Sequence, residues 1–171
     1  MQLNQADFVP RVREALARAQ LPATQLTLEV TESVLMNNID TAIPVLEELR
    51  RMGVTLSIDD FGTGYSSLNY LATLPIDALK VDRSFVERMS RDGHGNEIVK
   101  AIFKLGQALG KQVYAEGIET GTQLLLLQEL GCEYGQGYLL SRPLDADLAG
   151  TFPGVRLSPA VREAIAPVTV H

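Results

Sequence analysis

The chain has 171 residues, of which 46% are hydrophobic and 21% charged, a composition typical of one folded domain and not of a disordered chain. Its 21 acidic residues outnumber its 15 basic ones and give a net charge of −6, which argues against a protein that binds the DNA backbone. The single cysteine, Cys132, excludes an internal disulfide and a cysteine-rich zinc site.

Helix-like and strand-like segments alternate along the chain. Apolar residues at helical spacing, ended by proline or glycine, predict helices at residues 7–20, 40–52, 66–74, 95–109 and 121–130. Short runs rich in β-branched residues predict strands at residues 26–31, 54–59, 78–82, 112–117 and 134–140. This alternation indicates a parallel α/β architecture.

The longest predicted helix, 95–109, carries an apolar stripe formed by Ile98, Ile102, Leu105 and Leu109. No apolar run approaches the ~20 residues that cross a bilayer, and the first residues lack the regions of a signal peptide. We therefore expect no membrane segment and a reduced, cytoplasmic environment.

Each predicted strand has one apolar and one polar face, because side chains alternate along a strand. In a sheet that helices cover on both faces, the side chains on both faces of each strand are apolar. The polar face of the strands predicted here therefore fits better to a barrel that has helices only on its outside. The alternative, a solvated face of an antiparallel sheet, is disfavoured by the intervening helices. Asp59, Asp82 and Glu116 lie at the C-terminal strand ends, where a (β/α)8 barrel keeps its chemistry.

Carboxylates that converge at such a rim repel one another unless a cation lies among them. Oxygen-only ligands select Mg²⁺ or Mn²⁺, and paired ions are a recurrent device for cleaving phosphodiesters. In a regular strand, adjacent Asp59 and Asp60 point to opposite faces. A local break helped by Phe61 and Gly62 would turn both towards one ion or let Asp59 bridge two. Helix capping and salt bridges are the alternative for any one of these acids.

The sequence lacks the residues or spacings that other common catalytic and nucleotide-binding sites need. The two histidines, His94 and His171, are not at strand ends, and the chain has no P-loop motif. The GTG at 62–64 lacks the spacing of a dinucleotide fingerprint and follows two acids. Cys132 is interpreted as a small buried hydrophobe rather than a nucleophile.

Several motifs together resemble the EAL-domain family, bacterial phosphodiesterases that hydrolyse cyclic di-GMP to its linear dinucleotide. The matching segments cover nearly all of 26–144, and DDFGTGYSSL is highly specific by itself. They are LTLEVTES (26–33), DDFGTGYSSL (59–68), LPIDALKVDRSFV (74–86), YAEGIET (114–120) and GCEYGQGYLLSRPL (131–144).

The resemblance implies a metal site and a catalytic network. Glu29 is similar to the family's metal-ligating glutamate, Asp59 to the aspartate that bridges two metals, and Asp60 to the second metal's ligand. The ions would be Mg²⁺ or Mn²⁺. Lys80 resembles the lysine that holds the attacking water or the phosphate, and Asp82 a supporting acid.

The remaining positions extend this network. Glu116 resembles the glutamate that acts near the metal-bound water, as base, and Gln136 the glutamine that closes the far side of the site. Glu32 and Glu119 look like supporting residues, with Glu32 anchoring the 61–67 loop. In the family that loop is tied to substrate binding and to dimer contact, so we expect a homodimer through residues 61–72.

The resemblance also implies a departure at the front of the chain. We expect residues 1–150 to form a truncated EAL domain that lacks the first strands, the Glu-Ala-Leu motif and the asparagine metal ligand. The fold is then an α/β, incomplete TIM-like (β/α)8 barrel with about five of eight βα units. Residues 151–171 are expected to be a weakly structured tail.

Three explanations of the expected missing strands stay open. The chain is a fragment with sensory or diguanylate-cyclase domains upstream, a short protein completed by another chain, or a remnant that binds a partner. The predicted function is hydrolysis of cyclic di-GMP. The alternative is a non-catalytic module that binds cyclic di-GMP or a protein partner.

Overall fold

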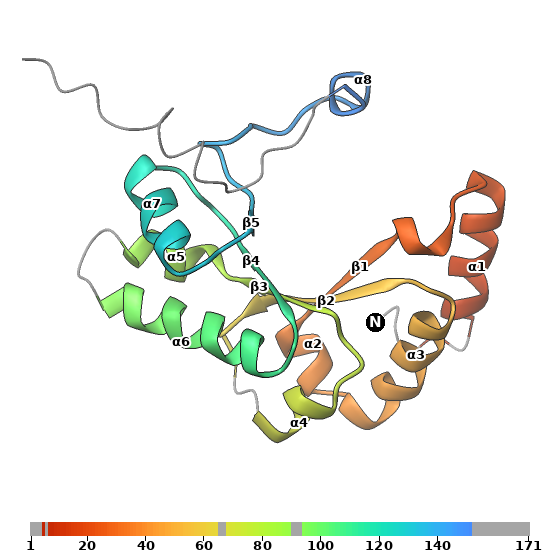
Figure 1. Ribbon diagram of the computed structural model, residues 1–171. Helices are drawn as coiled ribbons and strands as arrows, with labels where there is room; N and C mark the ends of the chain where they lie inside the picture. Colours follow the sequence, from red (N-terminus) through yellow and green to blue (C-terminus); the bar gives the residue numbers. More distant parts are fainter. Residues whose placement is uncertain (1–4, 6, 65–67, 90–93, 152–171) are drawn as a thin grey trace, which may run out of the picture. The chain divides into compact units, whose positions relative to one another are not determined.

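The computed structural model describes residues 5, 7–64, 68–89 and 94–151 (Figure 1). The chain divides into two compact units, Met1–Leu79 and Lys80–His171. Helices and strands alternate in both, as the sequence pattern predicts. Among the described residues, no helix is long and apolar enough to cross a membrane.

The first unit builds a pair of parallel strands with helices beside them. β1 and β2 pair from Thr27 with Thr55 to Thr31 with Asp59. Helix α3 packs on β2, and α1 packs on α3. The elements are α1 (Phe8–Ala19), the 3-10 turn η2 (Ala23–Gln25), β1 (Thr27–Thr31), α2 (Glu32–Met36), α3 (Ile39–Arg51), β2 (Thr55–Phe61) and α4 (Leu68–Thr73).

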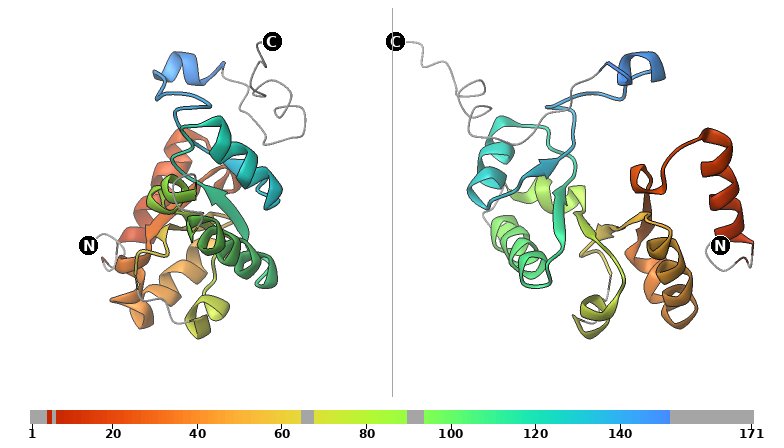
Figure 2. Two further views of the ribbon diagram at one scale, coloured as in Figure 1. Left: turned by 90° about the vertical axis from the view of Figure 1, so that its left-hand side faces the viewer. Right: turned by 45° about the vertical axis from the view of Figure 1, so that its right-hand side comes forward.

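The second unit repeats the arrangement. β4 and β5 pair in parallel, Tyr114 with Tyr134 and Ala115 with Gly135, and the two tyrosine rings stack 5.2 Å apart. Helix α6 packs on β4, and α5 packs on α6 and on α7; Figure 2 gives two further views of these helices. The elements are α5 (Arg83–Met89), α6 (His94–Ala108), β4 (Gln112–Ala115), α7 (Gly121–Glu129), β5 (Tyr134–Gly135) and α8 (Ala146–Ala149).

Strand β3 (Ala78–Val81) is buried along its whole length and contains the boundary between the units. In the first unit, the N–H of Asp77, just before β3, donates to the carbonyl of Leu56 in β2 at 2.8 Å. In the second unit, the carbonyl of Val81 accepts from the N–H of Glu116, just after β4, at 3.3 Å. Within the first unit Asp77 is thus tied to β2, and within the second unit Val81 is tied to the residue that follows β4.

The predicted elements are present, with short helices added. Helices α2, α5 and α8 were not expected, because four to seven residues are too few for a helical period to show. The last predicted strand, 134–140, is wrong beyond Gly135. There Leu140 and Ser141 donate to the carbonyl of Gly137 in a turn, and Leu139 donates to Ile118.

The predicted stripe of the long helix is also wrong in part. Ile98 is 41% exposed, whereas Val99, Ile102 and Phe103 are buried. The reason lies at Gly106, where an added Cβ would come within 2.2 Å of Val113 Cγ2 on β4. This close approach sets which face of α6 meets the strand. The tail expected at 151–171 lies outside the described residues apart from Thr151.

Candidate active site

The carboxyl end of β2 carries Asp59 and Asp60 at a break in the strand. Asp60 has φ 54°, in the left-handed region, and Gly62 has φ 99°. The carbonyl of Asp60 accepts from the N–H of Thr63 at 3.3 Å and from its hydroxyl at 2.8 Å, closing a turn. The left-handed region is uncommon outside glycine, and aspartate tolerates it better than most residues. The predicted local break is therefore present, and it is at Asp60 itself.

Glu32 holds the turn that follows this break. Its side chain is fully buried at the start of α2, and Oε2 accepts from the N–H of Gly62 at 2.8 Å and of Gly64 at 3.2 Å. A Cβ at Gly64 would come within 3.0 Å of Glu32 Oε1, so a side chain there would push the Glu32 carboxylate out of place by a few tenths of an ångström. The expected anchoring contact is present at residues 62 and 64. Residues 65–67 of the expected loop lie outside the described part.

Glu29 and Asp59 have their positions on the paired strands β1 and β2. Glu29 is opposite Ser57 in the parallel register, and Asp59 is two residues beyond Ser57 on the same strand face. Ser57 is 3% exposed, and its hydroxyl has no hydrogen-bond partner within the described residues. An unsatisfied buried hydroxyl beside carboxylates fits a polar interior that admits water or an ion. The oxygen-only donor set fits Mg²⁺ or Mn²⁺.

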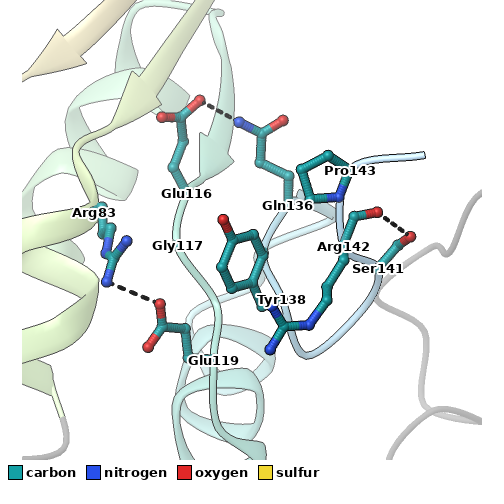
Figure 3. Close-up of a pocket in the computed structure, with 10 residues that line it drawn as sticks. Arg83, Glu116, Gly117, Glu119, Gln136, Tyr138, Ser141, Arg142 and Pro143 are labelled. Atoms are coloured by element: carbon teal, nitrogen blue, oxygen red, sulfur yellow. Dashed lines mark hydrogen bonds and ion pairs between the residues drawn. The ribbon is translucent and has the colours of Figure 1, made fainter. Parts of the chain in front are cut away.

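In the second unit, Lys80, Glu116 and Gln136 form one cluster. The ammonium group of Lys80, on β3, pairs with Oε1 of Glu116, and both side chains are at least 85% buried. Gln136 Nε2 donates to the same Oε1 at 2.8 Å, the contact drawn in Figure 3. A buried charge is tolerated where a partner of opposite sign compensates its desolvation. The cluster thus fixes a carboxylate and an ammonium group next to each other.

Glu116 and Gln136 also line a pocket of about 420 Å³ within the second unit. The pocket combines two arginines, a tyrosine and carboxylates (Figure 3). Arg142 Cζ is 5.0 Å from the centre of the Tyr138 ring, and Tyr138 is 53% exposed. The remaining lining is supplied by Arg83, Gly117, Glu119, Gly137, Ser141 and Pro143. A flat exposed ring beside guanidinium groups suits an aromatic, anionic ligand such as a nucleotide.

Asp82 and Glu119 have structural contacts that the sequence motifs did not indicate. Asp82 Oδ1 accepts from the N–H of Ser84 at 3.0 Å, so it caps the first turn of α5. Glu119 Oε1 pairs with Arg83 at 2.9 Å across the pocket wall. The structure thus gives Asp82 a capping contact and brings Glu119 to the pocket that Glu116 and Gln136 line. Their catalytic roles stay predictions.

Sequence reasoning missed the pocket residues Arg83, Tyr138 and Arg142. Arg83 directly follows Asp82 in the motif LPIDALKVDRSFV, and the other two lie in the segment 131–144 that carries the resemblance. The available signal was therefore proximity to recognised motifs. The segment 134–140 was interpreted as a strand, and this hid the role of Gly137 and Tyr138 in the pocket wall.

Cys132 is inert, as interpreted from the sequence. It is 3% exposed, and burial raises the pKa of its thiol to about 12. Its Sγ donates to the carbonyl of Tyr134 at 3.1 Å. It is therefore a small core residue under β5 and offers no nucleophile.

Comparison with known proteins agrees with this arrangement. The sequence-family model of the EAL domain matches residues 1–143 of the chain. The chain is 57% identical over 142 residues to the cyclic di-GMP phosphodiesterase NbdA of Pseudomonas aeruginosa, covering 83% of this chain and 18% of NbdA. It is 48% identical over 147 residues to MucR of the same organism, a bifunctional diguanylate cyclase/cyclic di-GMP phosphodiesterase, covering 86% of this chain and 22% of MucR. The chain thus spans about a fifth of the length of these curated relatives.

Solved structures show the same likeness. The PaMucR phosphodiesterase in complex with c-di-GMP aligns with a TM-score of 0.84 and 47% identity, over 86% of this chain and 60% of that one. A Klebsiella pneumoniae BlrP1 complex with manganese and cyclic di-GMP aligns with a TM-score of 0.77 and 37% identity, over 83% and 36% of the two chains. These EAL domains have a TIM-barrel fold, so the predicted α/β, TIM-like fold class is confirmed. The chain belongs to the EAL-domain family.

Proposed function

We propose that the chain hydrolyses one phosphodiester bond of cyclic di-GMP in a metal-dependent reaction that gives the linear dinucleotide. The observation that carries the proposal is the cluster in which buried Lys80 and exposed Gln136 both contact Glu116. Glu116 and Gln136 line a pocket that also presents Arg83 and Arg142. The membership of the EAL family and the names of the relatives NbdA and MucR support the same reaction.

The metal ligands of the proposal are Glu29, Asp59 and Asp60. With Mg²⁺ or Mn²⁺ bound, these carboxylates would hold a Lewis acid that activates water and stabilises charge on the phosphate oxygens. The break at Asp60 and the unsatisfied Ser57 hydroxyl support this assignment. The C-terminal strand ends of a TIM barrel open on one face, which supports assigning these acids to the same reaction as Lys80 and Glu116.

The residues of the second unit act on substrate and water. The Lys80 ammonium group is buried. It therefore attracts a phosphate oxygen more strongly than an ammonium group in water does, because the effective dielectric constant is lower there. Gln136 and Lys80 hold the Glu116 carboxylate in one orientation, as a general base needs in order to take a proton from an attacking water. Asp82 acts through the start of α5, which carries Arg83.

The substrate class follows from the pocket. Cyclic di-GMP is a dianion with two purine rings, and the chain as a whole carries a net charge of −6. A local group of cations is therefore required to attract the phosphates. Arg83 and Arg142 supply these cations, and Tyr138 offers a face on which a purine stacks.

The test is turnover of cyclic di-GMP by the 171-residue chain with Mg²⁺ or Mn²⁺, read as linear dinucleotide by chromatography. Asp59→Asn removes a metal-ligating charge, and we expect it to lower turnover by about a thousandfold or more. Asp40→Asn, the same exchange at an exposed position of α3, is the matched control and should retain full turnover. Equal turnover in the two variants would refute the metal assignment. Binding of cyclic di-GMP without hydrolysis would favour the non-catalytic module.

Two partner predictions accompany the proposal. A homodimer through residues 61–72 stays a prediction, and residues 65–67 of that segment lie outside the described part. The bifunctional name of MucR supports the expectation that a domain of this family works beside a cyclase domain.

A further inference from the structure

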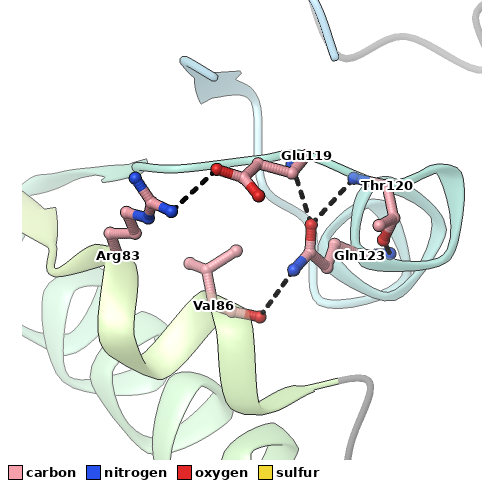
Figure 4. A network of polar contacts seen from close by, with 5 residues as sticks. All are labelled: Arg83, Val86, Glu119, Thr120 and Gln123. Atoms are coloured by element: carbon pink, nitrogen blue, oxygen red, sulfur yellow. Dashed lines mark hydrogen bonds and ion pairs between the residues drawn. The ribbon is translucent and has the colours of Figure 1, made fainter. Parts of the chain in front are cut away.

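Gln123 is a buried polar residue of α7 that lies outside the acidic motifs. Its side chain is 3% exposed, and every polar atom of its amide has a partner. Oε1 accepts from the N–H of Glu119 at 2.8 Å and of Thr120 at 2.9 Å. Nε2 donates to the carbonyl of Val86 in α5 at 3.4 Å, as Figure 4 shows.

Half of this arrangement is an ordinary helix cap. The Thr120 hydroxyl accepts from the N–H of Gln123 at 3.2 Å, and the Gln123 side chain accepts from the N–H of Thr120, which is a capping box. The contacts to Glu119 and Val86 exceed what capping requires. They tie the segment between β4 and α7 to a second helix, α5.

The segment held in this way carries the acids of the pocket. Glu116, the candidate base, precedes Glu119 by three residues, and both line the pocket. The segment has little freedom elsewhere: a Cβ at Gly117 would come within 2.3 Å of Arg83 Cγ, and Ile118 is fully buried. Gln123 fixes its far end, and the Arg83–Glu119 ion pair closes the same loop to α5.

We propose that Gln123 is a positioning residue: it sets the backbone of residues 116–120, and thereby the places of the Glu116 and Glu119 carboxylates, for the reaction proposed above, on which this inference rests. The amide is specifically suited to the place. A glutamate of the same length could accept both N–H groups, but it would turn a carboxylate towards the Val86 carbonyl. An asparagine keeps the amide but is one methylene too short to reach both elements.

Three variants separate positioning from mere stability. Gln123→Asn loses the reach, Gln123→Glu keeps the two acceptor bonds, and Thr120→Ala damages the cap of α7 while leaving the Gln123 contacts to Glu119 and Val86. Each is measured in the 171-residue chain by hydrogen exchange of the Glu119 amide, by thermal unfolding, and by kcat and KM for cyclic di-GMP.

We expect Gln123→Asn to speed exchange of the Glu119 amide and to lower kcat, each by about tenfold, with KM within about twofold. Gln123→Glu keeps the two acceptor bonds and loses the bond to Val86, so it should retain more amide protection and kcat than Gln123→Asn while lowering the unfolding temperature. Thr120→Ala should lower the unfolding temperature yet leave kcat within about twofold. Losses of kcat that follow the unfolding temperature equally in all three variants would overturn the positioning role, and so would a Gln123→Asn chain with unchanged exchange and kcat.

The two proposals fail in different ways. A chain without any turnover contradicts the proposed function. The exchange of the Glu119 amide, measured without ligand, then still decides whether Gln123 holds the segment.

Discussion

The two groups of candidate site residues are held by different means. In the first unit, the turn after Asp59 and Asp60 is fixed through its backbone, because the buried Glu32 accepts the N–H groups of Gly62 and Gly64. In the second unit, Glu116 is fixed through its side chain, by Lys80 and Gln136. A backbone anchor acts on chemistry only through geometry, whereas a side-chain cluster combines geometry with charge. Substitutions in the two places should therefore differ in kind.

Among the substitutions that test this comparison, Glu116→Gln should have the largest effect on turnover and stability. It removes the charge that compensates buried Lys80 and also removes the candidate base, so it should abolish turnover and destabilise the chain by about 3 kcal/mol. Chemical unfolding and product chromatography measure the two losses. Glu129→Gln, an exposed exchange on α7, is the matched control.

The double variant Lys80→Met/Glu116→Gln sharpens the same point. Because removing both charges leaves neither uncompensated, it should be more stable than Glu116→Gln alone while staying inactive. A double variant that is less stable than either single variant would show that the pair is not coupled.

A smaller effect is expected from Glu32→Gln in the first unit. The amide still offers one oxygen to the turn at Gly62 and Gly64, but the charge that strengthens both hydrogen bonds is lost. We expect turnover to fall by about tenfold and stability by about 1 kcal/mol. Glu47→Gln on the exposed face of α3 is its control. If Glu32→Gln were as damaging as Glu116→Gln, the proposed difference between backbone and side-chain anchoring would not hold.

The smallest effect concerns Cys132, whose thiol donates to the carbonyl of Tyr134 and which belongs to neither group of candidate site residues. Burial raises the pKa of its thiol from 9.0 to about 12, so the folded chain keeps the thiol protonated where the unfolded chain loses the proton. Stability should therefore fall as pH rises from about 9 to about 12, and Cys132→Ser should remove that part of the slope. Alkylation at pH 8 should be slow in the folded chain and fast in denaturant. Rapid alkylation of the folded chain would contradict the assigned burial.

The parts of this account that could be predicted are those with a local signal. The predicted strand boundaries place Asp59, Asp82 and Glu116 near strand ends, as the structure does, and Phe61-Gly62 predicted the break that the structure has at Asp60. The face of α6 could not be predicted, because it depends on how closely Gly106 approaches Val113 in another element.

The same limit applies to Gln123. The spacing Thr120-x-x-Gln123 is a visible capping signature, but the contacts to Glu119 and Val86 exist only after α5 and α7 have packed. The pocket wall at Tyr138 was hidden for a related reason. The segment 134–140 alternates like a strand, yet the approach of Ile118 to Gly137 turns the chain after Gly135.

The central claim is that the chain adds water to a phosphodiester bond of cyclic di-GMP. The most direct measurement is mass spectrometry of the product formed by the chain and Mn²⁺ in water labelled with ¹⁸O. The account predicts linear dinucleotide with one ¹⁸O on its terminal phosphate, formed by the unsubstituted chain and by Asp40→Asn but not by Asp59→Asn. Cyclic di-GMP that stays intact, or product that forms equally with Asp59→Asn, would contradict it.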